Sequence, residues 1–180
     1  GDLRAALLTS AMELLEADEP FSLRAVARAA GVSPTAPYRH FADREALESA
    51  LAVDGFVALT HALAAQGEPR SVEDLGGLAV TYVEFALDHP AVFKLMFGQE
   101  CDDSNDERVV AAGALRELLR DSLAGVFVAV DDDLAVGAWG LVHGLAFLHL
   151  DGKLPATPRL EVGRRVRAAL TAVVAATPRA

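Results

Sequence analysis

The chain has 180 residues, a formal net charge of −10 and 52% hydrophobic residues, enough to bury a substantial core in one or two domains. This apolar content excludes a disordered chain, and the single cysteine, Cys101, excludes an intrachain disulfide. A lone cysteine without a visible secretory signal leads us to expect a reducing, cytoplasmic location.

Apolar residues return every three or four positions along nearly the whole chain, and no stretch shows the sustained alternation of a strand. We therefore predict an all-α protein of about nine helices, separated by clusters of glycine, proline and aspartate. The predicted helices cover about 3–17, 23–30, a short segment after Ser33, 44–66, 72–88, 90–97, 106–129, 133–150 and 159–176. We assign residues 1–45 to an N-terminal domain and residues 46–180 to a C-terminal domain.

Residues 21–45 contain two short helices around a tight turn. Ser22 is a good N-cap for the first of them, and Gly31 suits the left-handed residue that ends it. Ser33 is predicted to cap the second helix, with Pro34 at its first position. Helix, glycine turn and helix in this order are typical of a helix-turn-helix DNA-binding element.

Positive charge is concentrated in the same segment. The first 66 residues carry nine acidic and five basic side chains. Between Arg24 and Arg44, however, the segment contains four arginines and only one aspartate, with His40 in addition. We expect this one face to contact phosphates while the rest of the chain repels DNA, so that non-specific binding is weak.

The segment AVARAAGVSPTAPYRHFADREAL resembles the N-terminal domain of the tetracycline-repressor (TetR) family of bacterial transcription regulators, with its motifs in the family's order and spacing. The chain departs from the family at Pro37, where an aliphatic residue is more common. The resemblance implies a homodimer that binds a near-palindromic double-stranded DNA operator, with repression as the expected effect.

Ten residues are predicted to contact DNA. Tyr38, His40 and Arg44 are expected on phosphates, and Thr35, Ala36 and Arg39 nearer the base edges. The full set is Ser22, Arg24, Ser33, Pro34, Thr35, Ala36, Tyr38, Arg39, His40 and Arg44.

The C-terminal half carries a second resemblance, in FALDHPAVFKLMFG and GAWGLVHGLAFLHLDG, to the regulatory domain called WHG. It implies a helical domain that binds a small-molecule effector and forms the dimer. Aromatic and sulfur-bearing side chains here favour an apolar or aromatic effector over a sugar or nucleotide. The predicted effector pocket comprises Phe85, Phe93, Met96, Phe97, Trp139, His143 and Phe147.

The helix predicted over 133–150 is apolar on both sides, so it needs two partners. Its glycine-bearing side, together with the last helix, is predicted to form the dimer interface through Gly137, Gly140, Leu141, Gly144, Leu148, Leu160, Val166, Leu170, Val173 and Val174. A membrane span is the alternative for this helix, but the stretch is slightly short and contains two histidines. We therefore predict no membrane association.

His143 leaves several interpretations open: a core histidine, a polar contact in the pocket, a metal ligand or a catalytic base. No second ligand type stands three or four residues away on its face, so we predict neither a metal nor a cofactor. No convergent set of nucleophile, base and orienting group indicates an enzyme. The alternatives to a ligand-responsive regulator are a helical protein-interaction module or a helical small-molecule-binding protein without DNA binding.

Overall fold

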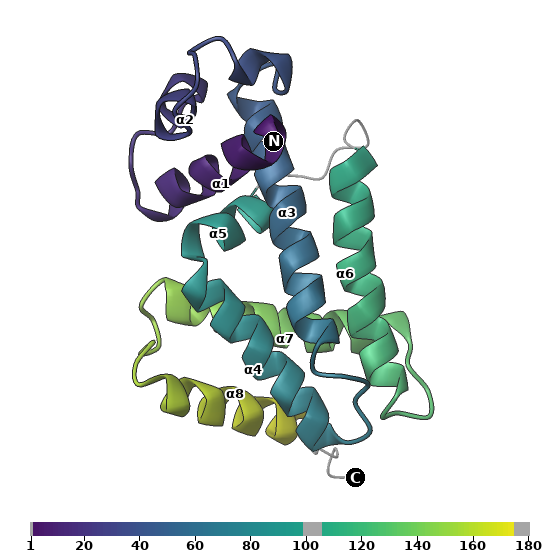
Figure 1. Ribbon diagram of the computed structural model, residues 1–180. Coiled ribbons are helices and arrows are strands. Elements are labelled where there is room, and N and C mark those ends of the chain that lie inside the picture. The colour runs from purple at the N-terminus through teal and green to yellow at the C-terminus, as the bar shows by residue number, and fades with distance from the viewer. Residues whose placement is uncertain (1, 99–105, 175–180) are drawn as a thin grey trace. The chain divides into compact units, whose positions relative to one another are not determined.

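The computed structural model describes residues 2–98 and 106–174, and all regular structure in these ranges is helical (Figure 1). The all-α prediction is confirmed. The elements in chain order are α1 (Leu3–Glu16), α2 (Leu23–Ala29), the short 3-10 helix η1 (Pro37–Arg39), α3 (Arg44–Ala64), α4 (Val72–Asp88), α5 (Pro90–Gly98), α6 (Asp106–Ala124), α7 (Asp132–Leu150) and α8 (Arg159–Val174). Cys101 lies outside the described residues.

The chain divides into two compact units. The first contains Gly1–Val57 and His89–Ala112, and the second contains Ala58–Asp88 and Gly113–Ala180. The long helices α3 and α6 each begin in the first unit and end in the second. Helix α5 groups with the first unit, whereas the sequence-based division assigns it to the C-terminal domain.

The core of the first unit is built by α1, α2 and the first half of α3. Their apolar stripes meet in a cluster of buried side chains: Leu7, Leu8, Ala11, Leu23, Val26, Phe41, Leu47, Ala50 and Leu51. Burial of this apolar surface, rather than helix propensity, holds such short helices in place.

The turn after α2 follows the predicted chemistry. The Ser22 side chain accepts a hydrogen bond from the Ala25 amide at 3.1 Å and caps the helix start. Gly31 has φ +68°, and its amide donates to the Arg28 carbonyl, while the Val32 amide donates to the Ala27 carbonyl. This pair of bonds is the Schellman ending of a helix. The predictions for Ser22 and Gly31 are confirmed.

The segment after the turn differs from the prediction. Ser33 does not cap an α-helix: its hydroxyl lies 3.3 Å from the Thr35 hydroxyl, and its carbonyl accepts from the Ala36 amide. Regular structure begins only at Pro37, as the 3-10 helix η1. Pro37 has no amide hydrogen to donate to the carbonyl four residues earlier, so the first α-helical turn cannot close there.

Helix α5 is held at both ends by charged side chains. The carboxylate of Glu16 accepts hydrogen bonds from the amides of Ala91 and Val92, at 3.1 and 3.0 Å. The Arg108 guanidinium, only 3% exposed, donates to the carbonyls of residues 95–96 at the other end. A negative group at the N-terminus and a positive group at the C-terminus both match the helix dipole.

Helix α5 also lies very close to α3 at Gly55. A Cβ atom at this position would be 2.7 Å from the Met96 sulfur and 2.7 Å from a Val92 methyl group. Only a glycine allows this separation, so Gly55 fixes the distance between the two helices.

The second unit is organised around α4, which packs against α8 and α7. Figure 1 shows α4 running beside α8. The buried face of α8 contains Val162, Gly163, Val166 and Leu170. An added Cβ at Gly163 would lie 3.5 Å from Val80, an ordinary van der Waals contact, so the packing of the two helices leaves room for a methyl group there.

Backbone strain at the turn can be tested with two glycines that both face open space. Gly31 and Gly113 have no atom within 4 Å of an added Cβ, but only Gly31 has a positive φ. Gly31→Ala should lower the free energy of unfolding by about 1–2 kcal/mol. Gly113→Ala, inside α6, should raise it by about 0.5–1 kcal/mol. Denaturant unfolding of both variants measures the difference, and a neutral Gly31→Ala would contradict the strain argument.

Candidate functional site

The predicted DNA-contacting residues lie on one exposed stretch of the first unit. Nine of the ten are exposed, and Ala36 is partly buried. Pro37 and Phe41 are buried, while Tyr38, Arg39 and His40 between them face solvent, Tyr38 with 52% exposure. The two buried residues therefore anchor η1 and leave its polar side chains outward.

Arg44 is held more firmly than the other predicted DNA-contacting arginines, Arg24 and Arg39. Its Nε donates to the Glu48 carboxylate at 2.6 Å, and its guanidinium carbon lies 5.5 Å from the centre of the Phe21 ring. Its side chain is 63% exposed, so the ion pair contributes only about 0–1 kcal/mol. A phosphate can replace or share this partner at small cost.

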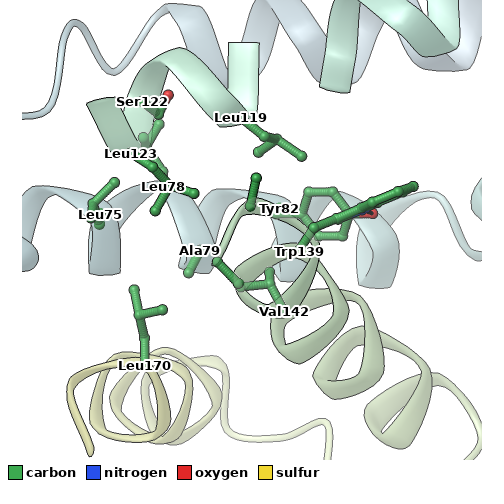
Figure 2. A pocket seen from close by; sticks show the side chains of 12 residues that line it. Leu75, Leu78, Ala79, Tyr82, Leu119, Ser122, Leu123, Trp139, Val142 and Leu170 are labelled. Atoms are coloured by element: carbon green, nitrogen blue, oxygen red, sulfur yellow. Dashed lines mark hydrogen bonds between the residues drawn. The ribbon is translucent and has the colours of Figure 1, made fainter. Parts of the chain in front are cut away.

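A second candidate site is an apolar cavity of the second unit, between α4, α6, α7 and α8 (Figure 2). Its volume is about 50 Å³. The walls are Leu75, Leu78, Ala79, Tyr82, Leu119, Ser122, Leu123, Ala135, Ala138, Trp139, Val142 and Leu170. Most of the wall is apolar, and the Ser122 hydroxyl in it donates to the Leu118 carbonyl. The other polar side-chain groups of the lining residues are the Tyr82 hydroxyl and the Trp139 N–H.

These two polar groups belong to a hydrogen-bonded chain that ends on His143. The Trp139 Nε1–H donates to the Tyr82 oxygen at 3.2 Å, and the Tyr82 oxygen lies 2.9 Å from His143 Nδ1. The indole is only a donor, and the Tyr82 hydroxyl that accepts from it can donate its own proton to His143. This arrangement fits a neutral imidazole whose Nδ1 accepts from Tyr82.

Burial favours this protonation pattern. It raises the pKa of Tyr82 well above the usual value, so the phenol keeps the proton that it donates. It lowers the pKa of His143 below 6.5, since a charged imidazole would lose its hydration. The three hydrogen-bonded side chains, Trp139, Tyr82 and His143, are therefore uncharged near pH 7.

The predicted pocket residues fall into two groups. Trp139, His143 and Phe147 follow one another along α7, with the His143 and Phe147 ring centres 4.9 Å apart. Phe93, Met96 and Phe97 belong to α5 and pack in the first unit, where the Phe97 ring lies 5.3 Å from that of Phe56. Phe85 is partly buried on α4. Of the seven, Trp139 is the one that lines the apolar cavity.

Sequence reasoning missed Tyr82 and the leucines of α4 and α6 that form most of the wall. Tyr82 lies on the apolar stripe of α4, where its buried position is visible from spacing. Its bonds to residues 57 and 61 positions away are not visible in any local pattern.

One face of α7 is not covered by the chain itself. Val136, Gly137, Gly140 and Leu148 are exposed, and added Cβ atoms at Gly137, Gly140 and Gly144 would meet nothing within 4 Å. Leu160 and Val173 of α8, from the predicted interface, are also exposed. Leu141, Gly144 and Val174 are partly buried, whereas Val166 and Leu170 face the core of the unit.

Two helices, Arg44–Ala64 and Asp132–Leu150, are long and apolar enough to cross a membrane by length and composition alone. The core helix of a water-soluble protein meets the same criterion, so this is weak support for a span. In residues 2–98 and 106–174, no three histidine, cysteine or acidic side chains gather as a metal site.

Comparison with protein families gives two matches. Residues 7–51 match the family of bacterial regulatory proteins called tetR, and residues 75–176 match the tetracyclin repressor-like C-terminal domain. An uncharacterized HTH-type transcriptional regulator from Haemophilus influenzae is 34% identical over 129 residues, which are 67% of this chain and 61% of that protein. The chain thus spans less than two thirds of the length of this relative.

Solved structures share the fold over nearly the full chain. A protein of unknown function from Rhodococcus sp. RHA1 is 35% identical with a TM-score of 0.80, covering 94% of both chains. The TetR-like regulator LfrR from Mycobacterium smegmatis, solved in complex with proflavine, is 20% identical with a TM-score of 0.63, covering 97% of this chain and 98% of its own.

The neutral state of His143 predicts a pH dependence of stability. Because folding lowers its pKa below 6.5, the unfolded chain binds the proton more tightly. The free energy of unfolding should therefore fall as pH decreases through about 6.5, by at most about 1.36 kcal/mol per pH unit for this group. His143→Asn keeps an acceptor near Nδ1 but does not titrate, so the stability of wild type relative to this variant should decline between pH 7.5 and 5. A constant difference in denaturant unfolding would refute the buried neutral histidine.

Proposed function

Because the chain belongs to the tetR family of bacterial regulatory proteins, we propose that it is a DNA-binding transcriptional regulator controlled by a small-molecule effector. The observation that carries the proposal is the helix-turn-helix geometry of the first unit. Helix α2 ends in a Schellman turn at Gly31, and the next segment presents Tyr38, Arg39 and His40 to solvent.

The exposed segment from Ser33 to Arg44, which we call the reading segment, enters the major groove of the operator. Pro37 and Phe41 fix it to the core, so its polar side chains need little ordering on binding. Thr35, Ala36 and Arg39 approach base edges, while Tyr38, His40 and Arg44 contact phosphates. Arg24 and Arg28 are exposed on α2 and add contacts to the phosphate backbone of the DNA.

The net charge of −10 makes specific contacts essential. Outside the arginine-bearing segment the surface repels the phosphate backbone, so sequence-independent attraction is small. The protein therefore discriminates well between its operator and other DNA.

The uncovered face of α7 is the basis for a homodimer. A surface with Val136, Leu148, Leu160 and Val173 exposed costs free energy in water, and the three glycines let a second helix approach closely. A symmetric pair of such faces places two reading segments on successive major grooves of a near-palindromic site.

Effector binding takes place in the second unit, beside the chain of Trp139, Tyr82 and His143. The proflavine complex of the LfrR neighbour is in line with a ligand in this class of fold. The cavity of about 50 Å³ holds only one or two water molecules, whereas small-molecule sites span roughly 300–1,000 Å³. The bound state is therefore a more open one, and the effector acts by favouring it.

The direction of control is repression released by the effector. Helices α3 and α6 run from one unit into the other, and α5 follows α4 after one residue, His89. Opening the cavity thus changes the helices that continue to the DNA-binding unit. An interaction module or a ligand-binding protein without DNA binding would select no operator from random duplexes.

The assignment of the reading segment predicts distinct effects on an operator selected from random DNA. If the Arg39 side chain contacts a guanine, Arg39→Ala should cost about 1–3 kcal/mol of binding free energy and relax the preference for that base. Arg44→Ala should weaken all sequences alike and reduce the salt slope by about 0.9. Lys153→Ala, an exposed cation after α7, serves as the control in fluorescence anisotropy titrations. If the double variant Tyr38→Ala/Arg39→Ala bound the selected operator with unchanged affinity, this segment would not be the part that recognises DNA.

The dimer assignment predicts that a large side chain on the uncovered face separates the protomers. Gly140→Leu has free space within its own chain, so the protomer should fold but elute as a monomer and lose tight operator binding. Gly113→Leu makes the same change at another open helical glycine and should remain dimeric. Light scattering decides the case, and a dimeric Gly140→Leu would remove α7 from the interface.

A further inference from the structure

Arg44 is held by two contacts of different kinds, both within the first unit. Its Nε donates to the Glu48 carboxylate at 2.6 Å, and its guanidinium carbon lies 5.5 Å from the centre of the Phe21 ring. Phe21 is partly buried against the core cluster of this unit, so its ring offers a fixed surface to the cation. A hydrogen bond at one atom and a ring beside the group together restrict both the position and the plane of the guanidinium.

The two members of this ion pair differ in exposure. The Glu48 side chain is 13% exposed, whereas the Arg44 side chain is 63% exposed. Glu48 lies one turn further along α3, and its low exposure limits its movement. Glu48 is therefore the fixed member of the pair, and Arg44 is the member that reaches into solvent.

The bond to Glu48 engages one of the three nitrogens of the Arg44 guanidinium. Such a group has five N–H donors, one on Nε and four on its two terminal nitrogens. In residues 2–98 and 106–174, the hydrogen bond of Arg44 to Glu48 runs from Nε. The terminal nitrogens remain as a fork that can form paired hydrogen bonds with the oxygens of a phosphate.

We propose that Glu48 is a positioning residue for DNA binding, which holds Arg44 through Nε so that the terminal nitrogens face a phosphate. Phe21 supports the same orientation from a second side. Glu48 does not touch the DNA, and its role rests on the proposed function, in which Arg44 contacts the backbone. The phosphate and Glu48 then share one guanidinium, and neither has to displace the other.

A carboxylate beside this arginine has two opposite effects on DNA binding. Its charge repels the phosphate, but the guanidinium stands between the two anions and water and salt screen them, so the repulsion weakens binding by about twofold or less. Its bond to Nε orders a long side chain in advance, and ordering such a side chain only on binding weakens affinity by roughly two- to tenfold. Positioning is the larger effect, so Glu48 should assist a contact with an anion although it is itself negative.

Two substitutions of Glu48 separate its charge from its hydrogen bond. Glu48→Gln keeps an oxygen that accepts from Nε and removes the charge, so it should bind the selected operator at least as tightly as wild type. Glu48→Ala removes both, and it should bind about two- to tenfold more weakly than Glu48→Gln. Fluorescence anisotropy at physiological salt measures the affinities, and denaturant unfolding establishes that both variants are folded at the assay temperature. Equal affinity of the two variants would overturn the positioning role.

Glu45 provides the matched control, because it is exposed in the first turn of the same helix and carries the same charge. Glu45→Ala should bind the operator at least as tightly as wild type, since it removes a negative charge without disturbing Arg44. An equal weakening by Glu45→Ala and Glu48→Ala would contradict the role assigned to Glu48.

A double-mutant cycle tests whether Glu48 acts through Arg44. In the Arg44→Ala background, adding Glu48→Ala should no longer weaken operator binding, since no guanidinium is left to orient. A weakening of the same size without Arg44 would mean that Glu48 acts through the fold, and the proposal would be refuted.

The same titrations distinguish failure of the positioning role from failure of the proposed function. Wild type that selects an operator, with Glu48→Ala as tight as Glu48→Gln, would refute positioning and leave the proposed function standing. Wild type that selects no operator from random duplexes would refute the proposed function and the role of Glu48 together.

Discussion

The two charged side chains at the ends of α5 fix the arrangement of the first unit. A helix of nine residues is too short to be stable alone, and its terminal amides and carbonyls need partners. Glu16 supplies them from α1 and Arg108 supplies them from α6. At Gly55 the same helix also touches α3, so three helices depend on one.

This arrangement ties the proposed DNA-binding elements to the rest of the first unit. Glu16 is the last residue of α1, which packs against α2, and α2 leads into the reading segment. Loss of the Glu16 carboxylate would leave two amides at the start of α5 without these bonds and loosen α1 together with the helix that it supports. Stability and the proposed DNA recognition are therefore linked at a residue outside the arginine-bearing segment.

Local sequence signals predicted much of the fold, because they rest on local chemistry. Ser22 and Gly31 act through their own backbone neighbours, so cap and turn could be identified from residue type alone. Ser33 and Pro34 give the same signals, but Pro37 three residues later removes a donor and the α-helix does not form. The predicted helix over 106–129 ends at Ala124, just before Gly125, where an added Cβ would lie 2.5 Å from the Pro69 carbonyl oxygen.

The candidate sites were harder to predict where they depend on distant contacts. The aromatic residues of α5 and α7 look alike in sequence, yet Phe93 and Met96 fill the core of the first unit while Trp139 lines a cavity of the second. Tyr82 was missed because an apolar stripe gives no sign of its hydroxyl's partners. For Arg108, a charged residue in the first turn of α6, burial could not be foreseen without the carbonyls that it contacts.

The uncovered face of α7 also affects how the protein is made. Its 19 residues are as apolar as a membrane span, yet only 22% of the apolar stretch is buried within the chain. In the proposed homodimer a second copy covers this surface, so a newly synthesised protomer exposes it until the two chains associate and is vulnerable to aggregation and proteolysis during that time. Folding yield and melting temperature then depend on protein concentration. At low expression the amount of active regulator would fall more steeply than the amount of chain, which makes the level of its own synthesis a determinant of its activity.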